Sequence, residues 1–114
     1  MEAYELSQLI DQRKQSGKLY LEFLRHPSMS LGLYVLPAGG VDPQQPHSEY
    51  EVYYVVSGRG LIRVDGEDQW VGPGTTVFVA AGVEHRFHSI VEELTVLVFF
   101  APAEYSLAKD SSTD

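Results

Sequence analysis

Cysteine is absent from the sequence, which excludes disulfide bonds, thiolate zinc sites and cysteine nucleophiles. A metal bound by this chain must therefore be held by nitrogen and oxygen ligands. Long apolar runs are absent too, since no window approaches the roughly 20 unbroken apolar residues of a membrane-spanning helix. We therefore expect a chain that folds in water and has no membrane partner.

Basic residues are scarce. Eight Lys and Arg residues stand against sixteen Asp and Glu residues, and the formal net charge is −8. Because a surface of this sign repels phosphate groups, we expect no nucleic-acid partner and no anionic membrane surface. Residues 1–15 also lack the basic and then apolar segments of a secretory signal, so we expect a cytoplasmic protein.

The length and composition of the chain are those of one domain. A chain of 114 residues can build a single core but is too short for two. Its hydrophobic fraction of 44% and charged fraction of 21% lie in the range of globular proteins. We expect an N-terminal arm with a short helix over residues 1–17, a β-barrel over 18–103 and a disordered polar tail over 104–114.

The order of the elements follows from the spacing of apolar residues. Leu6, Leu9 and Ile10 have helical spacing, and Gly17 is placed to end that helix in a left-handed conformation. Short segments rich in Leu, Val, Tyr and Phe follow, as is typical of an all-β sandwich or barrel. The expected strands are KLYLEFLR, LGLYVLP, EVYYVVSG, GLIRVDG, DQWVG, TTVFVA, HRFHS and ELTVLVFFAP. Two turns, VSGRG and VDGED, imply consecutive antiparallel strands.

The run LTVLVFF, residues 94–100, is apolar on both faces of its expected strand. A strand with one face in water would alternate, so both faces of this strand must be covered. One face lines the barrel interior, and the other lies either under the N-terminal helix or against a second subunit. A homodimer is therefore the protein partner that we expect, with burial inside a single domain as the alternative.

Polar groups with metal-binding chemistry precede one of these strands. If Glu51 begins a strand, then His47 and Gln45 lie on its face, because side chains alternate along an extended chain. After a turn further along, His85 opens another short strand. Two imidazoles and one carboxylate with open positions form the arrangement of non-haem iron enzymes and of many other metal sites. These donors suit iron, zinc, manganese, nickel or copper.

The first of these segments resembles the first motif of the cupins. That motif has glycine, five residues, histidine, one residue, histidine, three or four residues, glutamate, six residues and glycine. The matching positions here are Gly39, Gln45, His47, Glu51 and Gly58. Every spacing fits, and glutamine replaces the first histidine.

The second segment resembles the second cupin motif. That motif has glycine, five residues, proline, one residue, glycine, two residues, histidine, three residues and asparagine. The matching positions are Gly74, Ala80, Gly82, His85 and Ser89. The metal-binding histidine is kept, while alanine replaces the proline and serine the asparagine.

The resemblance covers residues 30–101 and implies a double-stranded β-helix, that is, a jelly-roll barrel, preceded by the short helix. It also implies one divalent transition metal, with the four ligand positions falling on Gln45, His47, Glu51 and His85. The amide oxygen of Gln45 is a neutral donor, weaker than imidazole toward late transition metals. We therefore expect either looser binding or a three-ligand site in which Gln45 contacts a bound water.

The other polar residues near these positions have simpler interpretations. Glu49 is displaced from the motif, and we expect a solvated loop carboxylate. His88 has the opposite parity from His85 and should face outward. His26, in a loop without a partner, is expected on the polar surface.

Tyr53 should point into the barrel beside the ligands, together with Phe87. There it fills the core with its hydroxyl satisfied by a neighbour, or it acts as a catalytic residue that donates a proton or hydrogen bond to a bound substrate. Tyr34 is similar, but the sequence does not determine its parity.

Two classes of function follow from the resemblance. The first is a small-molecule enzyme of dioxygenase, lyase or isomerase type that holds one metal in the barrel. The alternative is a non-catalytic sensor or storage module for a metal or small ligand. The fold does not select between them, and the sequence shows no DNA-binding helical segment or basic patch. A third alternative, a purely structural barrel, requires an empty ligand set.

Overall fold

The computed structural model describes residues 1–43 and 46–106, which form one helix and an antiparallel sheet. The elements are α1 (Leu6–Ser16), β1 (Tyr20–His26), β2 (Met29–Leu36), β3 (Tyr50–Val64), β4 (Glu67–Val71), β5 (Thr76–Val79) and β6 (His85–Ala101). In the sheet the strands follow the order β1-β2-β6-β3-β4, and β5 pairs with β3. The expected all-β fold with one short helix is therefore confirmed. None of the helices in the described part of the chain is long and apolar enough to cross a membrane.

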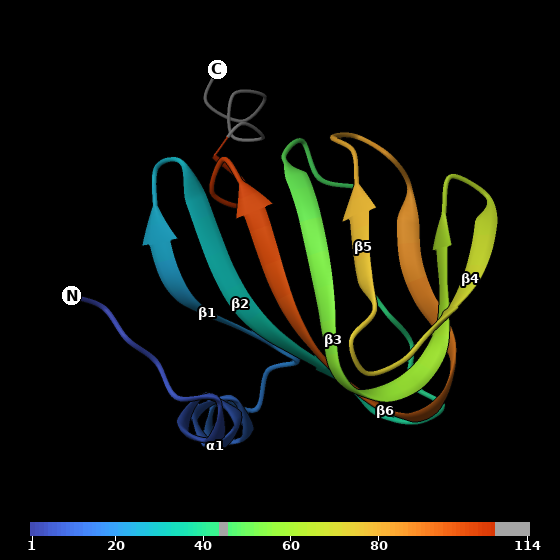
Figure 1. The fold of residues 1–114 in the computed structure, drawn as a ribbon, viewed down its shortest axis with the longest axis horizontal. Helices are drawn as coiled ribbons and strands as arrows, with labels where there is room; N and C mark the ends of the chain where they lie inside the picture. The colour runs from blue at the N-terminus through green and yellow to red at the C-terminus, as the bar shows by residue number, and fades with distance from the viewer. Residues whose placement is uncertain (44–45, 107–114) are drawn as a thin grey trace.

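Two long strands shape the molecule. β3 and β6 pair along most of their length, and their register shifts between Val55 and Leu61. Such irregularities bend a strand, and Figure 1 shows β3 and β6 curving round together so that the two halves of the sheet face each other. The bend turns one sheet into a barrel that encloses a core.

The segment VSGRG lies within this bend, so our prediction of a hairpin turn at that place is wrong. Gly58 has a φ of 97°, and a Cβ atom there would lie 2.0 Å from the carbonyl oxygen of Glu93 on β6. The glycine therefore permits a close approach of two paired strands, and the chain direction does not reverse. The turn at Asp65–Gly66 is confirmed, because both residues have positive φ and join β3 to its partner β4.

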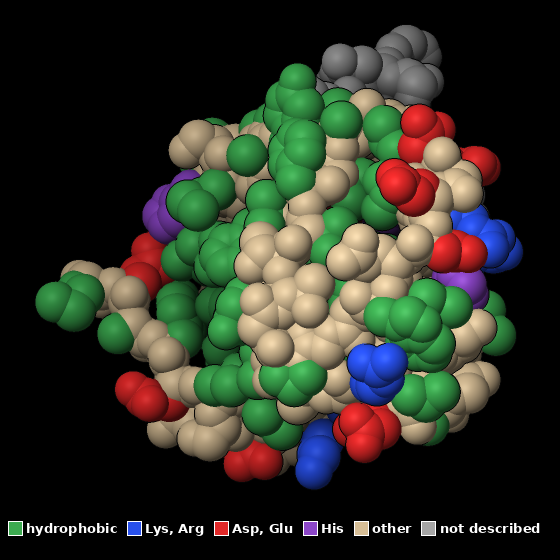
Figure 2. All heavy atoms as spheres, turned by 45° about the vertical axis from the view of Figure 1, so that its right-hand side comes forward, with side chains coloured by type: hydrophobic (Ala, Val, Ile, Leu, Met, Phe, Trp, Pro, Cys, Tyr) green, Lys and Arg blue, Asp and Glu red, His purple; other side chains and the backbone are tan. Residues whose placement is uncertain are grey.

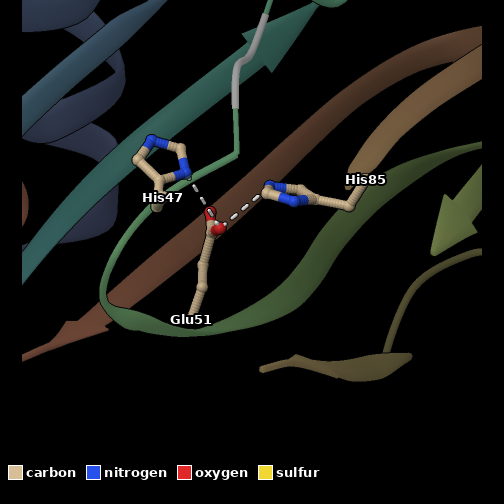
Figure 3. Close-up of side chains that lie close together, drawn as sticks. All are labelled: His47, Glu51 and His85. Atoms are coloured by element: carbon tan, nitrogen blue, oxygen red, sulfur yellow. Dashed lines mark ion pairs between the residues drawn. The ribbon is translucent and has the colours of Figure 1, made fainter. Parts of the chain in front are cut away.

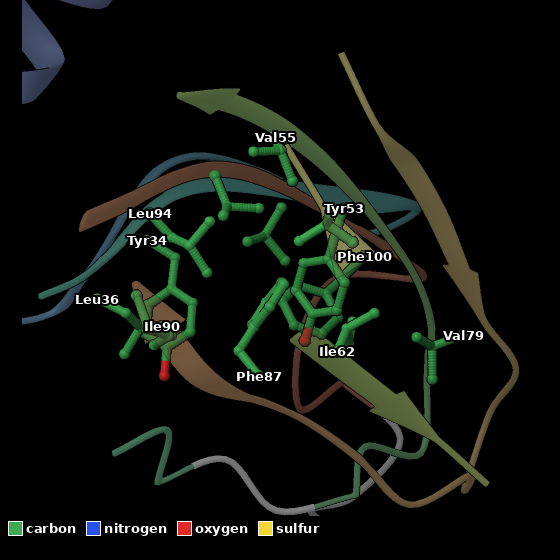
Figure 4. Close-up of a cluster of buried hydrophobic side chains, with 13 residues drawn as sticks. Tyr34, Leu36, Tyr53, Val55, Ile62, Val79, Phe87, Ile90, Leu94 and Phe100 are labelled. Atoms are coloured by element: carbon green, nitrogen blue, oxygen red, sulfur yellow. The ribbon is translucent and has the colours of Figure 1, made fainter. Parts of the chain in front are cut away.

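The barrel encloses the main hydrophobic core (Figure 4). Its members come from β2, β3, β4, β5 and β6 and include Tyr53, Val55, Ile62, Phe87 and Leu94, all at most 2% exposed. Full burial of such side chains contributes about 1.5–3 kcal/mol each. This packing holds the inner faces of the strands at fixed positions next to the polar site.

A second, smaller cluster lies on the outer face of the sheet. Leu9 of α1 packs there with Leu33 and Val35 of β2, and Leu97 of β6 lies against them. The helix ends as expected at Gly17, whose φ is 72°. The helix therefore covers part of the outer face of the apolar strand, as one of our two alternatives required.

Candidate metal centre

Three side chains from two separate segments converge at one end of the core. His47 lies in the segment that leads into β3, Glu51 lies near the start of β3, and His85 begins β6. All three are buried, at 6%, 1% and 6% exposure, and their ligand atoms lie within 4.8 Å of one another (Figure 3). The structure thus brings together three of the four predicted metal ligands.

Backbone contacts explain how the two segments meet. The N–H of Gly82 donates to the carbonyl of His47 at 2.6 Å, which joins the turn before β6 to the segment before β3. Glu51 pairs with Val79 of β5 on one side and with Phe100 of β6 on the other. The carboxylate therefore projects from a strand that is held on both sides.

The side-chain atoms that face one another are close but make no hydrogen bonds. Glu51 Oε1 lies 3.0 Å from His85 Nε2 and 3.5 Å from His47 Nδ1. These contacts lack hydrogen-bond geometry, so both nitrogens and both Glu51 oxygens are buried without a hydrogen-bond partner. Unsatisfied buried polar atoms are costly and rare, and a divalent cation would coordinate their lone pairs. The donor set therefore fits a metal.

The other ring nitrogen of each histidine has a partner. His85 Nδ1 donates to the carbonyl of Val83 at 2.9 Å. His47 Nε2 lies 3.3 Å from Oε2 of Glu104, a residue just beyond β6. These outer contacts hold both rings with one nitrogen turned toward Glu51.

Although His47, Glu51 and His85 are buried, their contacts with neighbouring groups shift the pKa of each toward its charged form. Burial lowers the pKa of His47, but contacts with Glu104 and Glu51 outweigh it and raise this pKa to about 9. The pKa of His85 is also raised, because Glu51 and the Val83 carbonyl outweigh burial. Burial raises the pKa of Glu51, yet both histidines together leave it below its ordinary value.

A cavity of about 310 Å³ opens beside His47. Its walls are mostly apolar and aromatic; they are formed by Leu19, Tyr20, Tyr34, Pro43, His47, Val98, Phe100, Glu104 and Tyr105. The volume lies at the lower end of the range for small-molecule pockets. A small organic molecule in this cavity would contact His47 directly.

The comparison with known families agrees with this arrangement, because the model of the cupin domain matches residues 32–101. The chain belongs to the cupin family. An uncharacterised protein of Streptomyces coelicolor is 50% identical over 104 residues, which cover 91% of this chain and 99% of that protein. The predicted family and jelly-roll fold are therefore confirmed.

Two solved structures are similar to this one. TT1209 from Thermus thermophilus has a TM-score of 0.71 and 26% identity, and the match covers 90% of this chain and 99% of that chain. The DMSP lyase DddQ from Ruegeria pomeroyi has a TM-score of 0.63 and 25% identity, with 67% of this chain and 39% of that chain covered.

Three further candidate residues are Gln45, Tyr53 and Tyr34. Gln45, the residue at the missing cupin histidine, lies outside the described residues. Tyr53 points into the core as predicted, is fully buried, and its ring lies 4.9 Å from that of Phe87 and 6.0 Å from that of His85. Tyr34 is also buried, and its hydroxyl donates to Asp42.

His88 and His26 lie away from the cupin site. His88 Nε2 contacts Asp68 at 2.9 Å on the outside of the sheet, with a quarter of its side chain exposed. His26 is half exposed and lies 2.9 Å from Glu2. Both histidines therefore lie on the surface, as expected, while the partner of His26 and its place at the end of β1 were not expected.

Glu49 corrects one prediction, because it is not a solvated carboxylate. It is 1% exposed and accepts a hydrogen bond from Ser48 Oγ at 2.7 Å. Residues 48–49 form a bend before β3 begins at Tyr50, yet Glu49 keeps the inward side that its shared parity with His47 and Glu51 indicates, so displacement from the motif does not place it in solvent. The carboxylate is turned inward.

Glu104 was missed by the sequence reasoning. We placed it in the disordered tail, but the structure describes residues 104–106, and Glu104 is 9% exposed; residues 107–114 lie outside the described part. A single glutamate after a strand carries no motif. No signal in the sequence pointed to its contact with His47.

Proposed function

We propose that this cupin binds one divalent transition metal through His47, Glu51 and His85 and transforms a small organic molecule in the adjoining cavity. The observation that carries the proposal is the buried set of four ligand atoms without hydrogen-bond partners. The cavity shares His47 with this set, so a substrate would meet the metal there.

The residues of the chain have separate tasks in such a reaction. When bound, the metal would supply Lewis-acid or redox chemistry. Glu51 and the two histidines would hold it, and the aromatic walls from Tyr20 and Phe100 would exclude water from the substrate. Tyr53 supports the ring of His85 from the core.

Dioxygenase, lyase and isomerase chemistry are the reaction classes that we propose for this site, because cupins support many activities on one fold. A lyase is supported by the similarity to DddQ, which is named as a DMSP lyase. An oxygenase would require a redox metal such as iron.

Metal analysis of protein purified without a histidine tag tests the proposal. We expect about one equivalent of a transition metal in the wild type and a loss of most of it in His47→Ala and His85→Ala. His26→Ala is the matched control, because His26 lies on the surface, and it should keep the metal. A wild type that binds no added iron, zinc, manganese, nickel or copper would overturn the proposal.

The identity of the metal decides the next assay. With iron, oxygen consumption is measured against catechols, diketones and flavonols. With a non-redox metal, elimination and isomerisation of small organic acids and esters are measured instead. Metal binding without turnover in either panel would support the sensor or storage module.

A further inference from the structure

Glu104 contacts the metal centre although it belongs to neither cupin motif. Its Oε2 lies 3.3 Å from Nε2 of His47, while Nδ1 of the same ring faces Glu51 Oε1 at 3.5 Å. The side chain of Glu104 is only 12% exposed. One imidazole thus lies between two carboxylates, of which only Glu51 belongs to the group of converging ligands.

The backbone of Glu104 is fixed at both of its polar groups. Its N–H donates to Ser30 Oγ at 2.9 Å, and Ser30 is fully buried in β2. Its carbonyl accepts a hydrogen bond from Arg25 Nη2 of β1, also at 2.9 Å. Because the backbone is already ordered, the carboxylate reaches His47 at a reduced cost in conformational entropy.

The two histidines of the site are held in parallel ways. His85 donates its Nδ1–H to the carbonyl of Val83, so its Nε2 faces Glu51. His47 has its Nε2 at Glu104, so its Nδ1 faces Glu51. Metal-binding histidines generally donate their second N–H to a carbonyl or carboxylate, which fixes the tautomer and strengthens the ligand.

We propose that Glu104 is a positioning residue of the metal centre, whose carboxylate accepts the Nε2–H of His47 and so presents Nδ1 as the ligating atom. This inference rests on the proposed metal site. The contact of His47 Nε2 with Glu104 is 3.3 Å long, against 2.9 Å for that of His85 Nδ1 with the Val83 carbonyl, and the charge of the carboxylate strengthens its attraction for the ring N–H.

Metal affinity of variants tests this role. The metal-free wild type, Glu104→Gln and Glu104→Ala are titrated with Zn²⁺ against a chromophoric chelator, and with Co²⁺ for its absorption spectrum. We expect Glu104→Ala to weaken Zn²⁺ binding about 10- to 100-fold and to change the Co²⁺ spectrum. Glu104→Gln should lie between, because its amide oxygen still accepts a hydrogen bond. The exposed Glu93→Gln on β6 is the matched control and should bind as the wild type does.

A readout in the metal-free protein separates this inference from the metal site itself. The ¹H–¹⁵N spectrum of the histidine rings should show a slowly exchanging Nε2–H of His47 in the wild type. Glu104→Ala should lose that signal, while the Nδ1–H of His85 persists. If the wild type binds no metal, the proposed function fails, yet this spectrum still decides whether Glu104 orients His47.

The result that would overturn the inference is a folded Glu104→Ala protein with wild-type Zn²⁺ affinity and an unchanged His47 signal. Circular dichroism and thermal unfolding establish that the variant is folded. If Glu104→Ala does not fold, Glu104→Gln decides, because it keeps the shape of the side chain. Affinity of Glu104→Gln equal to that of the wild type, with an unchanged spectrum, would then reject the role of the charge.

Discussion

At the scale of single residues, the candidate metal centre depends on which atom of each side chain is left without a hydrogen-bond partner. His47 Nδ1, His85 Nε2 and the two Glu51 oxygens face one another, while the outer nitrogens are held by Glu104 and by the Val83 carbonyl. Residue types at motif spacing indicated these three side chains as candidate ligands. Only the folded geometry shows which nitrogen of each ring faces the carboxylate.

The role of Gln45 as a metal ligand remains a prediction, because this residue lies outside the described residues. Cupins have a histidine at its position, and imidazole is a stronger ligand than an amide oxygen for late transition metals. We expect Gln45→His to raise Zn²⁺ affinity, because an imidazole nitrogen would replace the weaker amide oxygen as a donor. Isothermal titration of metal-free wild type and variant measures the change. Unchanged affinity would show that residue 45 does not take part in binding.

At the scale of elements, the bend shared by β3 and β6 brings the site together, since it folds one sheet over the core (Figure 1). His85 and Glu51 lie at the starts of these two strands. We read the two halves of each strand as separate strands, because glycine and polar residues at the bend resemble a turn in a linear sequence. Pairing between strands far apart in the chain decides that they continue.

Gly58 tests the bend. An alanine there would have both a left-handed backbone and a Cβ atom 2.0 Å from the carbonyl oxygen of Glu93, whereas Gly17 has a φ of 72° and open space around it. We expect Gly17→Ala to cost about 1–2 kcal/mol from the backbone alone. Gly58→Ala should cost about 1–3 kcal/mol more, because the strands must separate. Urea unfolding measures the loss of stability in both variants. Equal losses would show that the strands can separate at the bend without an additional cost.

Asp68 of β4 joins three strands through side-chain contacts. It contacts Arg63 of β3 through two hydrogen bonds of 2.9 Å and His88 of β6 at 2.9 Å. Arg63 and then His88 lower the pKa of this exposed carboxyl to about 2. Since the folded pKa is below the unfolded one, the contribution of Asp68 to stability is present at neutral pH and is lost as the pH falls from about 4 toward 2.

We therefore expect Asp68→Asn to destabilise the protein at pH 6 and to do so less at pH 3. Urea unfolding of wild type and variant at both pH values gives the two differences. The same substitution is also made in an Arg63→Gln background, which removes the largest cause of the lowered pKa of Asp68. In that background the loss of stability caused by Asp68→Asn should depend less on pH. A difference that is the same at pH 6 and pH 3 in the wild-type background would contradict the role of Asp68.

At the scale of the whole molecule, α1 covers only part of the outer face of the sheet. Large hydrophobic side chains remain exposed on the outer side of β3 and β5, where Tyr50 and Phe78 stack with ring centroids 5.9 Å apart and Tyr54 is 41% exposed. In the face drawn in Figure 2, hydrophobic side chains lie between scattered charged groups. Exposed apolar patches of this kind often mark protein contacts.

The homodimer thus remains a prediction. The exposed side chains now indicate the outer side of β3 and β5 as its interface, whereas the sequence indicated the outer face of residues 94–100. Sedimentation equilibrium should give twice the chain mass of 12.7 kDa. Phe78→Ser should shift the equilibrium toward the monomer, because it removes half of the stacked pair. The surface variant Met29→Ser, on another strand, is the control. A wild type that sediments as a monomer at high micromolar concentration would contradict the prediction.

The sequence by itself determined the family, the barrel and the residues His47, Glu51 and His85, because motif spacing and alternating burial are local properties of the chain. Tertiary structure decided the continuity of β3 and β6 and the contact of Glu104 with His47. Each of these depends on segments that lie far apart in the chain and meet only when the sheet bends. The candidate ligands were therefore predictable from spacing, whereas the contact of Glu104 with one of them was not.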